Sequence, residues 1–307
     1  MKPTAKVIAD SISPGGSRLT TLEVKIHRLI LAEMNTHRMF SRNYRSSRAV
    51  PVHKLLEEVE NDPAMPLFWG RNEPGMSAST QLEGEELESV KDTWLASAKV
   101  AATTARILAG KGLHKQIANR VLEPYLWTYG VITSTEWDNF FGLRLDKAAQ
   151  PEMRMAARVM WDAINNSIPS FVDFGKWHLP YVTQEEKDTQ HNAQLLRTSV
   201  ARCARVSYKP FDADRLSTPE EDTALFSKLV GEQPIHASPA EHQATPVMTV
   251  SKYKGSNLIG WDQLRKTLVG EDVAPLPPGY KKAEYMVERF GARAVTMISP
   301  SEQPLLG

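Results

Sequence analysis

The sequence predicts an α+β fold in which a mixed or antiparallel sheet is packed by long helices. Residues 20–26 alternate in the manner of a strand with one buried face, and they follow a turn at residues 13–16. Residues 125–135 are rich in aromatic and β-branched side chains, which favours a second strand. Residues 85–108 instead carry apolar side chains at helical spacing, at Val90, Trp94, Ala98, Ala101 and Ala105.

The same patterns predict the other elements in the first half of the chain. Residues 27–35 and 55–61 are expected to form short helices. Residues 63–83 are rich in Pro, Gly, Ser and Asn, which is typical of a long loop. Three further helices are predicted, over residues 114–122, 136–144 and 150–168.

The periodic pattern weakens over residues 170–196, which contain Pro180 and a charged run. This stretch is therefore the best candidate for a linker. A second block of elements is expected after it. It comprises strands over residues 199–208 and 245–253 and helices over residues 219–231 and 281–290.

Composition restricts the class of protein. The 307 residues are 41% hydrophobic and 24% charged, close to the average for globular proteins, which argues against disorder. The net charge of +1 gives no overall attraction to nucleic acid or membranes, so any anion site has to be local. The start of the chain lacks the apolar core of a signal peptide, and no run is apolar enough for a membrane helix. We therefore expect a cytoplasmic protein.

The single cysteine, Cys203, excludes an internal disulfide, which fits a reducing compartment. It lies in the run R-C-A-R-V-S-Y, which resembles a buried strand, so we interpret it as a small core residue and not as a nucleophile. His236, Glu241 and His242 could suggest a metal site. Their spacing around Pro239 does not place two histidines one helical turn apart, so we predict no metal.

An arginine-rich segment, residues 36–48, is the strongest candidate for a binding site. It reads T-H-R-M-F-S-R-N-Y-R-S-S-R and contains no acid. Arginine forks and serine hydroxyls suit phosphate oxygens, so the segment could cradle a nucleotide phosphate. Composition alone equally allows a solvated basic loop. Nucleic-acid binding is less favoured, because only Phe40 and Tyr44 could stack on bases.

Three blocks of the sequence resemble the flavin-dependent thymidylate synthases (the ThyX family). The arginine-rich segment matches the signature R-H-R-x-x-S-x-N-x-x-S-x-R except at its first position, and residues 139–152 resemble the stretch N-F-x-x-L-R-x-x-x-x-A-Q-x-E. Residues 204–208 (A-R-V-S-Y) and 236–242 (H-A-S-P-A-E-H) resemble A-R-V-S-[FY] and H-x-[ST]-P-F-E-H. In the family these last two elements come first. We therefore infer a circular permutation, which requires only that the termini of the domain lie close together.

The resemblance implies one catalytic domain over residues 1–307. Within it, residues 1–170 would form the arginine-motif and nucleotide block, residues 197–255 the permuted flavin block, and residues 256–307 a C-terminal extension. The implied cofactors are FAD, 5,10-methylenetetrahydrofolate as carbon donor and NADPH as reductant. The implied assembly is a homotetramer with active sites between subunits, without membrane or nucleic-acid partners.

The resemblance also implies roles for individual residues. The catalytic groups would be Arg144, Ser46 and His236, with Arg144 stabilising negative charge on the pyrimidine ring. The substrate phosphate would be held by Ser46, Arg48 and Arg120. The flavin would be lined by a larger set, namely His37, Arg38, Asn43, Asn139, Ser207, Ser238 and Glu241. Glu33 stands where the family often has glutamine, and a carboxylate there would repel phosphate.

Four departures from the family pattern bear on the reaction. Thr36, Tyr44, Ala49 and Ala148 replace an arginine, a glutamate, a tyrosine and a histidine. The resemblance implies transfer of a one-carbon unit to C5 of dUMP, giving dTMP. Two alternatives stay open, a flavin-dependent hydroxymethylase of dCMP or dUMP, and a non-catalytic protein that binds nucleotides or nucleic acid on the same scaffold.

Overall fold

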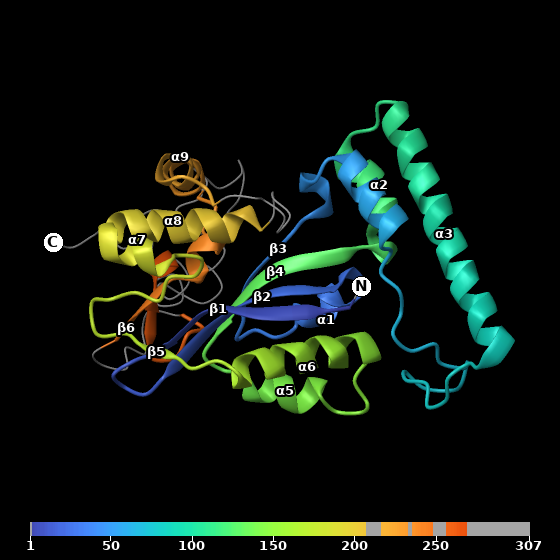
Figure 1. Cartoon of the computed structure of the whole chain (residues 1–307), viewed down its shortest axis with the longest axis horizontal. Helices are drawn as coiled ribbons and strands as arrows, with labels where there is room; N and C mark the ends of the chain where they lie inside the picture. The colour runs from blue at the N-terminus through green and yellow to red at the C-terminus, as the bar shows by residue number, and fades with distance from the viewer. Residues whose placement is uncertain (1, 207–215, 233–234, 248–255, 269–307) are drawn as a thin grey trace, which may run out of the picture.

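A five-stranded mixed sheet forms the middle of the computed structural model, which describes residues 2–206, 216–232, 235–247 and 256–268 (Figure 1). Its strands are β1 (Thr4–Ile12), β2 (Arg18–His27), β3 (Ser41–Tyr44), β4 (Trp127–Ser134) and β5 (Ser170–Phe171). Their spatial order is β3-β4-β2-β1-β5, and every neighbouring pair is antiparallel except β1 and β5. With the helices that cover both of its faces, this sheet confirms the predicted α+β fold.

Strands β2 and β4 confirm the predictions for residues 20–26 and 125–135. Strands β1, β3 and β5 are not predicted from the sequence. Strand β3 is the polar run S-R-N-Y inside the arginine-rich segment, and its composition is that of a loop. It is a strand because its backbone pairs with residues 130–133 of β4, a contact between segments distant in sequence.

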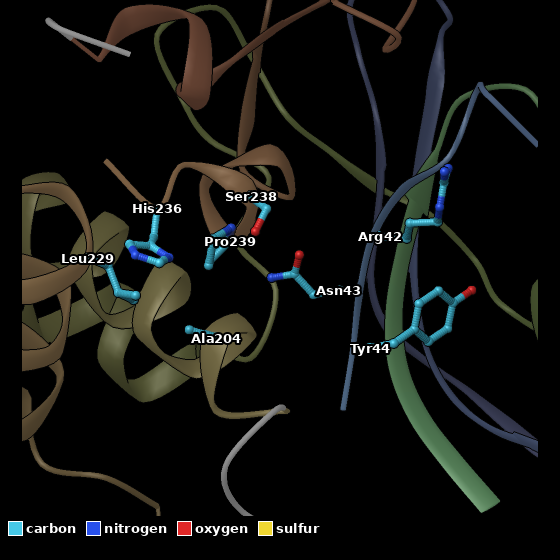
Figure 2. A pocket seen from close by; sticks show the side chains of 8 residues that line it. All are labelled: Arg42, Asn43, Tyr44, Ala204, Leu229, His236, Ser238 and Pro239. Carbon is cyan, nitrogen blue, oxygen red and sulfur yellow. The ribbon is translucent and has the colours of Figure 1, made fainter. Parts of the chain in front are cut away.

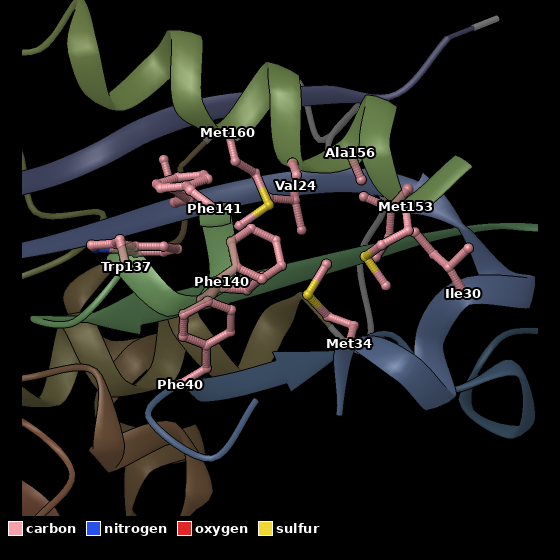
Figure 3. Close-up of a cluster of buried hydrophobic side chains, with 14 of the residues drawn as sticks. Val24, Ile30, Met34, Phe40, Trp137, Phe140, Phe141, Met153, Ala156 and Met160 are labelled. Carbon is pink, nitrogen blue, oxygen red and sulfur yellow. The ribbon is translucent and has the colours of Figure 1, made fainter. Parts of the chain in front are cut away.

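Helices α5 (Asp138–Arg144) and α6 (Pro151–Asn165) cover one face of the sheet (Figure 1). Their apolar side chains form the main core with those of β2 and β4, and Phe140, Met153 and Met160 lie at its centre (Figure 3). Burial of such side chains contributes about 1.5–3 kcal/mol each, so this face fixes where the two helices lie. The helices predicted over residues 136–144 and 150–168 are confirmed, although α6 ends at Asn165.

A separate group of helices lies at one end of the sheet (Figure 1). The long α3 (Gly84–Gly110) packs on α2 (Val52–Asn61) through small side chains, because Ala98, Ala102 and Ala105 of α3 are buried. These two helices and the loop over residues 63–83 are as predicted. The helix predicted over residues 114–122 is instead α4 (Lys115–Ala118) followed by the 3-10 helix η3 (Asn119–Tyr125).

The predicted short helix over residues 27–35 consists of the 3-10 helix η1 (Arg28–Ile30) and α1 (Leu31–Met34). In the second half of the chain, a smaller two-stranded sheet pairs β6 with β7. The elements of this half are α7 (Gln184–Thr189), α8 (Asn192–Arg205), α9 (Pro219–Val230), η4 (Ser238–Glu241), β6 (Ala244–Pro246), β7 (Trp261–Gln263) and η5 (Leu264–Thr267).

The strand predicted over residues 199–208 is wrong, because the chain forms α8 up to Arg205. All side chains from Thr198 to Ala204 are buried. A segment buried all round has no exposed face, so its polarity does not reveal the helical period. Cys203 therefore lies in a helix, which packs on Val131 of β4 across the face of the sheet opposite α6.

Residues 170–196 are not a linker in the structure. They contain β5, α7 and the start of α8, and His178 and Leu179 are buried. The polar residues that suggest a linker stabilise this part of the fold instead. Thr183 and Glu186 form a capping box at the start of α7, and Glu186 also pairs with the buried Arg202.

The helix predicted over residues 219–231 is confirmed as α9, which Thr218 caps. The strand predicted over residues 245–253 begins as β6, but residues 248–255 lie outside the described residues. The helix predicted over residues 281–290 also lies outside them. Within the described part of the chain, no helix has the length and apolarity needed to cross a membrane.

The α8-side face of the sheet has a polar centre. Five buried side chains meet there, Ser11, Thr21, Thr133, His178 and His242. Burial lowers the pKa of both histidines to about 3, so both imidazoles are neutral at pH 7. The native protein therefore does not bind the protons that the unfolded chain takes up below a histidine pKa of about 6.5.

We expect acid to destabilise the fold through these histidines. Their contribution to stability is complete above pH 6.5 and is lost as the pH falls from 6.5 toward 3, because only the unfolded chain binds protons in that window. Each histidine should cost about 2 kcal/mol of unfolding free energy between pH 7 and pH 5. Urea unfolding at both pH values measures this, with the exposed His53→Gln as a control that should keep the full loss. Equal stability at the two pH values would show that the histidines are not buried as neutral groups.

Strand β3 lies against a glycine of its neighbour. Tyr44 pairs with Gly130 of β4, and a Cβ atom at Gly130 would lie 2.3 Å from Tyr44 Cδ1. No side chain other than hydrogen therefore fits at this position without moving the tyrosine ring. This contact gives a structural role to Tyr44, which replaces a glutamate of the family signature.

Gly130→Ala should destabilise the protein by about 1–3 kcal/mol, because the added methyl group overpacks the space that the Tyr44 ring fills. The matched control is Gly110→Ala at the end of α3, where a Cβ atom meets nothing within 4 Å. That change should be neutral or stabilising by up to about 1 kcal/mol, because alanine favours a helix over glycine. Chemical denaturation compares the two variants. Equal effects would mean that Tyr44 does not restrict residue 130.

Candidate functional site

Strand β3 directs alternate side chains of the arginine-rich segment to opposite sides. Figure 2 shows Asn43 pointing toward Ser238 of η4, whereas Arg42 and Tyr44 point away from it. The front of the chain and residues 236–242 therefore meet within one chain, as the permuted order requires. A cavity of about 250 Å³ lies there, lined by Arg42, Asn43, Tyr44, Ala204, Leu229, His236, Ser238 and Pro239.

Three polar side chains at this cavity have no hydrogen-bond partner among the described residues. Asn43 is 9% exposed. In the part of the chain that the structure describes, neither its amide nor the side chains of Ser238 and His236 form a hydrogen bond. Ser238 and His236 are exposed, so their polar groups are open to the cavity. Such a set of free groups around a cavity is typical of a binding site that a polar ligand completes.

The C-terminal part of the described chain holds the two sides of the cavity together. Gln263 Nε2 donates hydrogen bonds to Ser41 Oγ at 2.9 Å and to the carbonyl oxygen of Glu241 at 2.8 Å. Ser41 begins β3 and Glu241 ends η4, so one buried amide fixes both elements. The Glu241 carboxylate is paired with Arg265, so an arginine balances the charge of this predicted flavin contact.

A second group of predicted site residues surrounds Arg144 at the end of α5. Its Nε donates to His37 Nε2 at 2.9 Å, and its Nη1 lies 3.2 Å from Glu33 Oε2. Burial lowers the pKa of His37, and the positive charges of Arg144 and Arg42 lower it further. His37 is therefore neutral and carries its hydrogen on Nδ1. Glu33, whose role is open from the sequence, holds the guanidinium of Arg144.

A third group contains the predicted phosphate residues. Arg120 Nη1 lies 2.7 Å from Glu123 Oε1, which also accepts hydrogen bonds from Arg28 and from Ser47 Oγ. Asn119 donates to the carbonyl oxygen of Ser47, which brings Arg120 beside the chain at residues 46–48. Ser46 is half-buried there. The Arg48 side chain is exposed, and no acceptor within the described residues engages it.

Two further arginines of the segment, Arg42 and Arg45, stabilise the fold. Arg42 donates to the carbonyl oxygens of Asn35, His37 and Phe40, which fixes the loop before β3. Arg45 is buried, donates two hydrogen bonds to Glu58 and lies over the Tyr129 ring at 4.5 Å. The segment contains no acid, and among the described residues a carboxylate pairs with one of its arginines, Arg45.

The predicted site residues thus form three groups in a single chain. Of the predicted site residues that the structure describes, only Asn43, Ser238 and His236 line the cavity. Neither the Arg144 group nor the Arg120 group reaches it. Arg38 and Asn139 are exposed, and their side chains pair with nothing among the described residues. Ser207 lies outside the described residues.

Sequence reasoning missed Glu123 and Gln263 as site residues. Glu123 follows Arg120 by three residues, and that helical spacing is a signal for an ion pair that could have been used. Gln263 gives no such signal, because its partner Ser41 is 222 residues away in the sequence. Trp261, in the same strand, is packed in a small core with Leu19 and Leu258.

Cys203 is a buried core residue, as predicted. Burial raises the pKa of its thiol, and the Gln243 amide contacts the sulfur at 3.5 Å. A buried thiol of this kind is a poor nucleophile. Among the described residues, no group of three or more His, Cys, Asp or Glu side chains could hold a metal ion.

Comparison with known proteins gives one family match. The family model for "Thy1: Thymidylate synthase complementing protein" matches residues 17–170, half of the chain. The matched region contains β2 to α6, with the arginine-rich segment and Arg144. It ends before residues 204–242, which is consistent with a flavin block that stands outside the usual order. No curated protein matches the sequence.

Two solved structures similar to this chain are of a UMP/dUMP methylase, PolB from Streptomyces cacaoi. The structure bound with 5-Br dUMP is 18% identical, covers 53% of this chain and 90% of its own, and has a TM-score of 0.43. The structure bound with 5-Br UMP is 18% identical, covers 53% of this chain and 88% of its own, and has a TM-score of 0.42.

Proposed function

Because the chain belongs to the thymidylate synthase complementing protein family, we propose that it transfers a one-carbon unit to C5 of a pyrimidine deoxynucleoside monophosphate. The reaction proposed is the conversion of dUMP to dTMP, with FAD as cofactor, methylenetetrahydrofolate as carbon donor and NADPH as reductant. The observation that supports it most is the cavity at which the arginine-rich segment meets residues 236–242. These two motifs are distant in the sequence, and both contribute side chains to the cavity.

The cavity residues fit the ring system of a flavin. Asn43 and Ser238 offer a free amide and a free hydroxyl, and the flavin ring carries both donors and acceptors. The other groups proposed to hold FAD are His37, Arg38, Asn139, Ser207, Glu241 and His236, and of these His236 lines the cavity in a single chain. The bound flavin would supply the redox chemistry of the transfer, while the protein orients it and excludes water.

Arg144 is proposed to act on the substrate base. Its side chain is 21% exposed, and Glu33 and His37 hold its guanidinium in place, so little order has to be gained when the base binds. A fixed cation stabilises negative charge that develops on the pyrimidine ring during attack at C5. Ser46, Arg48 and Arg120 are proposed to bind the phosphate, with Arg48 as the free cation.

The division of the site into three groups supports a homotetramer with sites between subunits. The cavity, at about 250 Å³, lies below the usual range of about 300–1,000 Å³ for ligand pockets and is too small for a whole dinucleotide. Exposed apolar side chains flank the predicted contacts, with Met39 beside Arg38 and Leu143 beside Arg144. A second subunit over this surface would bury them and complete the site.

The proposed function is tested on the purified protein. We expect it to be yellow, with flavin absorbance, and to convert dUMP into a product in which a methyl group replaces one hydrogen, heavier by one CH2 unit, when NADPH and methylenetetrahydrofolate are present. Mass spectrometry of parallel reactions with dUMP and dCMP identifies the product. A hydroxymethyl product would establish the hydroxymethylase instead. A colourless protein that binds nucleotides without turnover would establish the non-catalytic alternative.

Two arginine variants separate the roles of base and phosphate. Arg144→Ala should retain flavin but lose turnover, because the removed group acts on the base. Arg48→Ala should weaken nucleotide binding by about 1.5–3 kcal/mol, the range for a hydrogen bond to a charged group, with flavin retained. Arg158→Ala is the matched control, since this arginine is exposed on α6 and pairs only with Asp162. Calorimetric titration with dUMP and steady-state rates give both quantities, and full activity in both site variants would place the site elsewhere.

A further inference from the structure

A continuous series of buried hydrogen bonds runs across strands β1, β2 and β4 toward the candidate site. Ser11 Oγ lies 2.8 Å from His178 Nδ1, and His178 Nε2 lies 2.7 Å from Thr21 Oγ1. Thr21 Oγ1 lies 2.7 Å from Thr133 Oγ1, which lies 2.8 Å from His242 Nδ1. We name these residues, Ser11, His178, Thr21, Thr133 and His242, the polar relay.

The polar relay joins the two halves of the chain. Thr21 and Thr133 face each other across β2 and β4, within the region that matches the family model. His242 directly follows η4, whose Ser238 lines the cavity. His178 also contacts the chain just after η4, because its backbone N–H donates to the carbonyl oxygen of Ala244 at 2.8 Å. The relay therefore attaches residues 236–242, which we call the η4 motif, directly to the sheet.

The two ends of the relay differ. Ser11 lines a second cavity of about 650 Å³ at the β1 edge of the sheet, which includes Lys176, Trp177 and Lys187. His242 Nε2 is fully buried and has no hydrogen-bond partner within the described part of the chain. One end thus opens toward a cavity, and the other ends in the interior beside the η4 motif.

Two arrangements of the relay use the hydroxyl hydrogens of both threonines. Each hydroxyl and each neutral imidazole contributes one hydrogen, and each of the four contacts uses one. A buried threonine hydroxyl whose hydrogen has no acceptor is unfavourable, so the remaining hydrogen is expected either on Ser11 or on His242 Nε2. In the first arrangement both histidines carry their hydrogen on Nδ1, and in the second both carry it on Nε2. The tautomers of His178 and His242 are therefore the same in both arrangements, although Thr21 and Thr133 lie between the two rings.

We propose that His178 is a positioning residue of the candidate site, which acts through Thr21 and Thr133 to fix the tautomer of His242 and the place of the η4 motif. The proposal deepens the proposed function, because it identifies what holds one wall of the flavin cavity. His242 Nε2 is a donor in one arrangement and an acceptor in the other. The end of the relay at Ser11 therefore decides what His242 offers beside η4.

The coupling of tautomers is tested by NMR of the histidine ring nitrogens in the full-length protein at pH 7. We expect His178 and His242 to show the same tautomer. The resonances that are absent from the spectrum of His178→Gln are assigned to the His178 ring. In Thr133→Val the tautomer of His242 should change or become mixed while that of His178 stays. Thr133→Ser keeps the hydroxyl and should restore the wild-type spectrum. Different tautomers in the wild type would overturn the relay.

Flavin affinity tests the effect on the site. Thr133→Val should weaken FAD binding by about threefold to tenfold, the value of one neutral hydrogen bond, whereas Thr133→Ser should bind as the wild type does. Thr128→Val is the matched control, since Thr128 is equally buried on the same strand and bonds only to the Arg45 carbonyl oxygen. Thermal melts verify that each variant is folded.

The outcomes separate this proposal from the proposed function. A wild type that binds no FAD would refute the flavin chemistry, while the NMR comparison would still decide whether the relay exists. Normal FAD binding in the wild type, with Thr133→Val equal to Thr133→Ser, would refute the positioning role alone. Weaker binding in Thr133→Val and in Thr128→Val alike would mean that any buried threonine on β4 has this effect, which also refutes it.

Discussion

The contact between strand β3 and the η4 turn is the constraint on which the rest of the structure depends. Strand β3 carries Asn43 from the front of the chain, and η4 carries Ser238 from the back. Two sets of hydrogen bonds hold them in register, Gln263 with Ser41 and Glu241 on one side, and Thr133 with His242 on the other. Without these bonds the two motifs would be separate surface features, and the cavity between them would not form.

Carboxylates from outside the arginine-rich segment decide which arginines are free. Glu58 holds the buried Arg45 with two hydrogen bonds, and a charge pair in that position stabilises the fold more than an exposed one does. Glu123 binds Arg120, so a phosphate has to compete with a carboxylate for that guanidinium. An ion pair of this kind orients an arginine before the ligand arrives, at the cost of part of its affinity.

The sequence predicts those parts of the fold and of the site in which local pattern and function coincide. The alternating pattern of β2 and the long helical pattern of α3 are local, and both are confirmed. Strand β3 is not predictable, because its polar composition is that of a loop and only the partner β4 makes it a strand. Helix α8 is misread as a strand because burial on all sides removes its period. The motif spacing identifies Asn43 and Ser238, but nothing local identifies Gln263, whose partners are distant in sequence.

The two faces of the sheet are specialised in a way that connects stability with function. The face under α6 is apolar and supplies the driving force for folding. The face under α8 contains the polar relay, and buried polar groups contribute less stability than well-packed apolar groups of the same size. They do specify one arrangement, because a shift of η4 by one residue would break the hydrogen bond between His242 and Thr133. The candidate site is assembled from two distant parts of the chain. Such a site requires this specificity where the two parts meet, and the relay lies there.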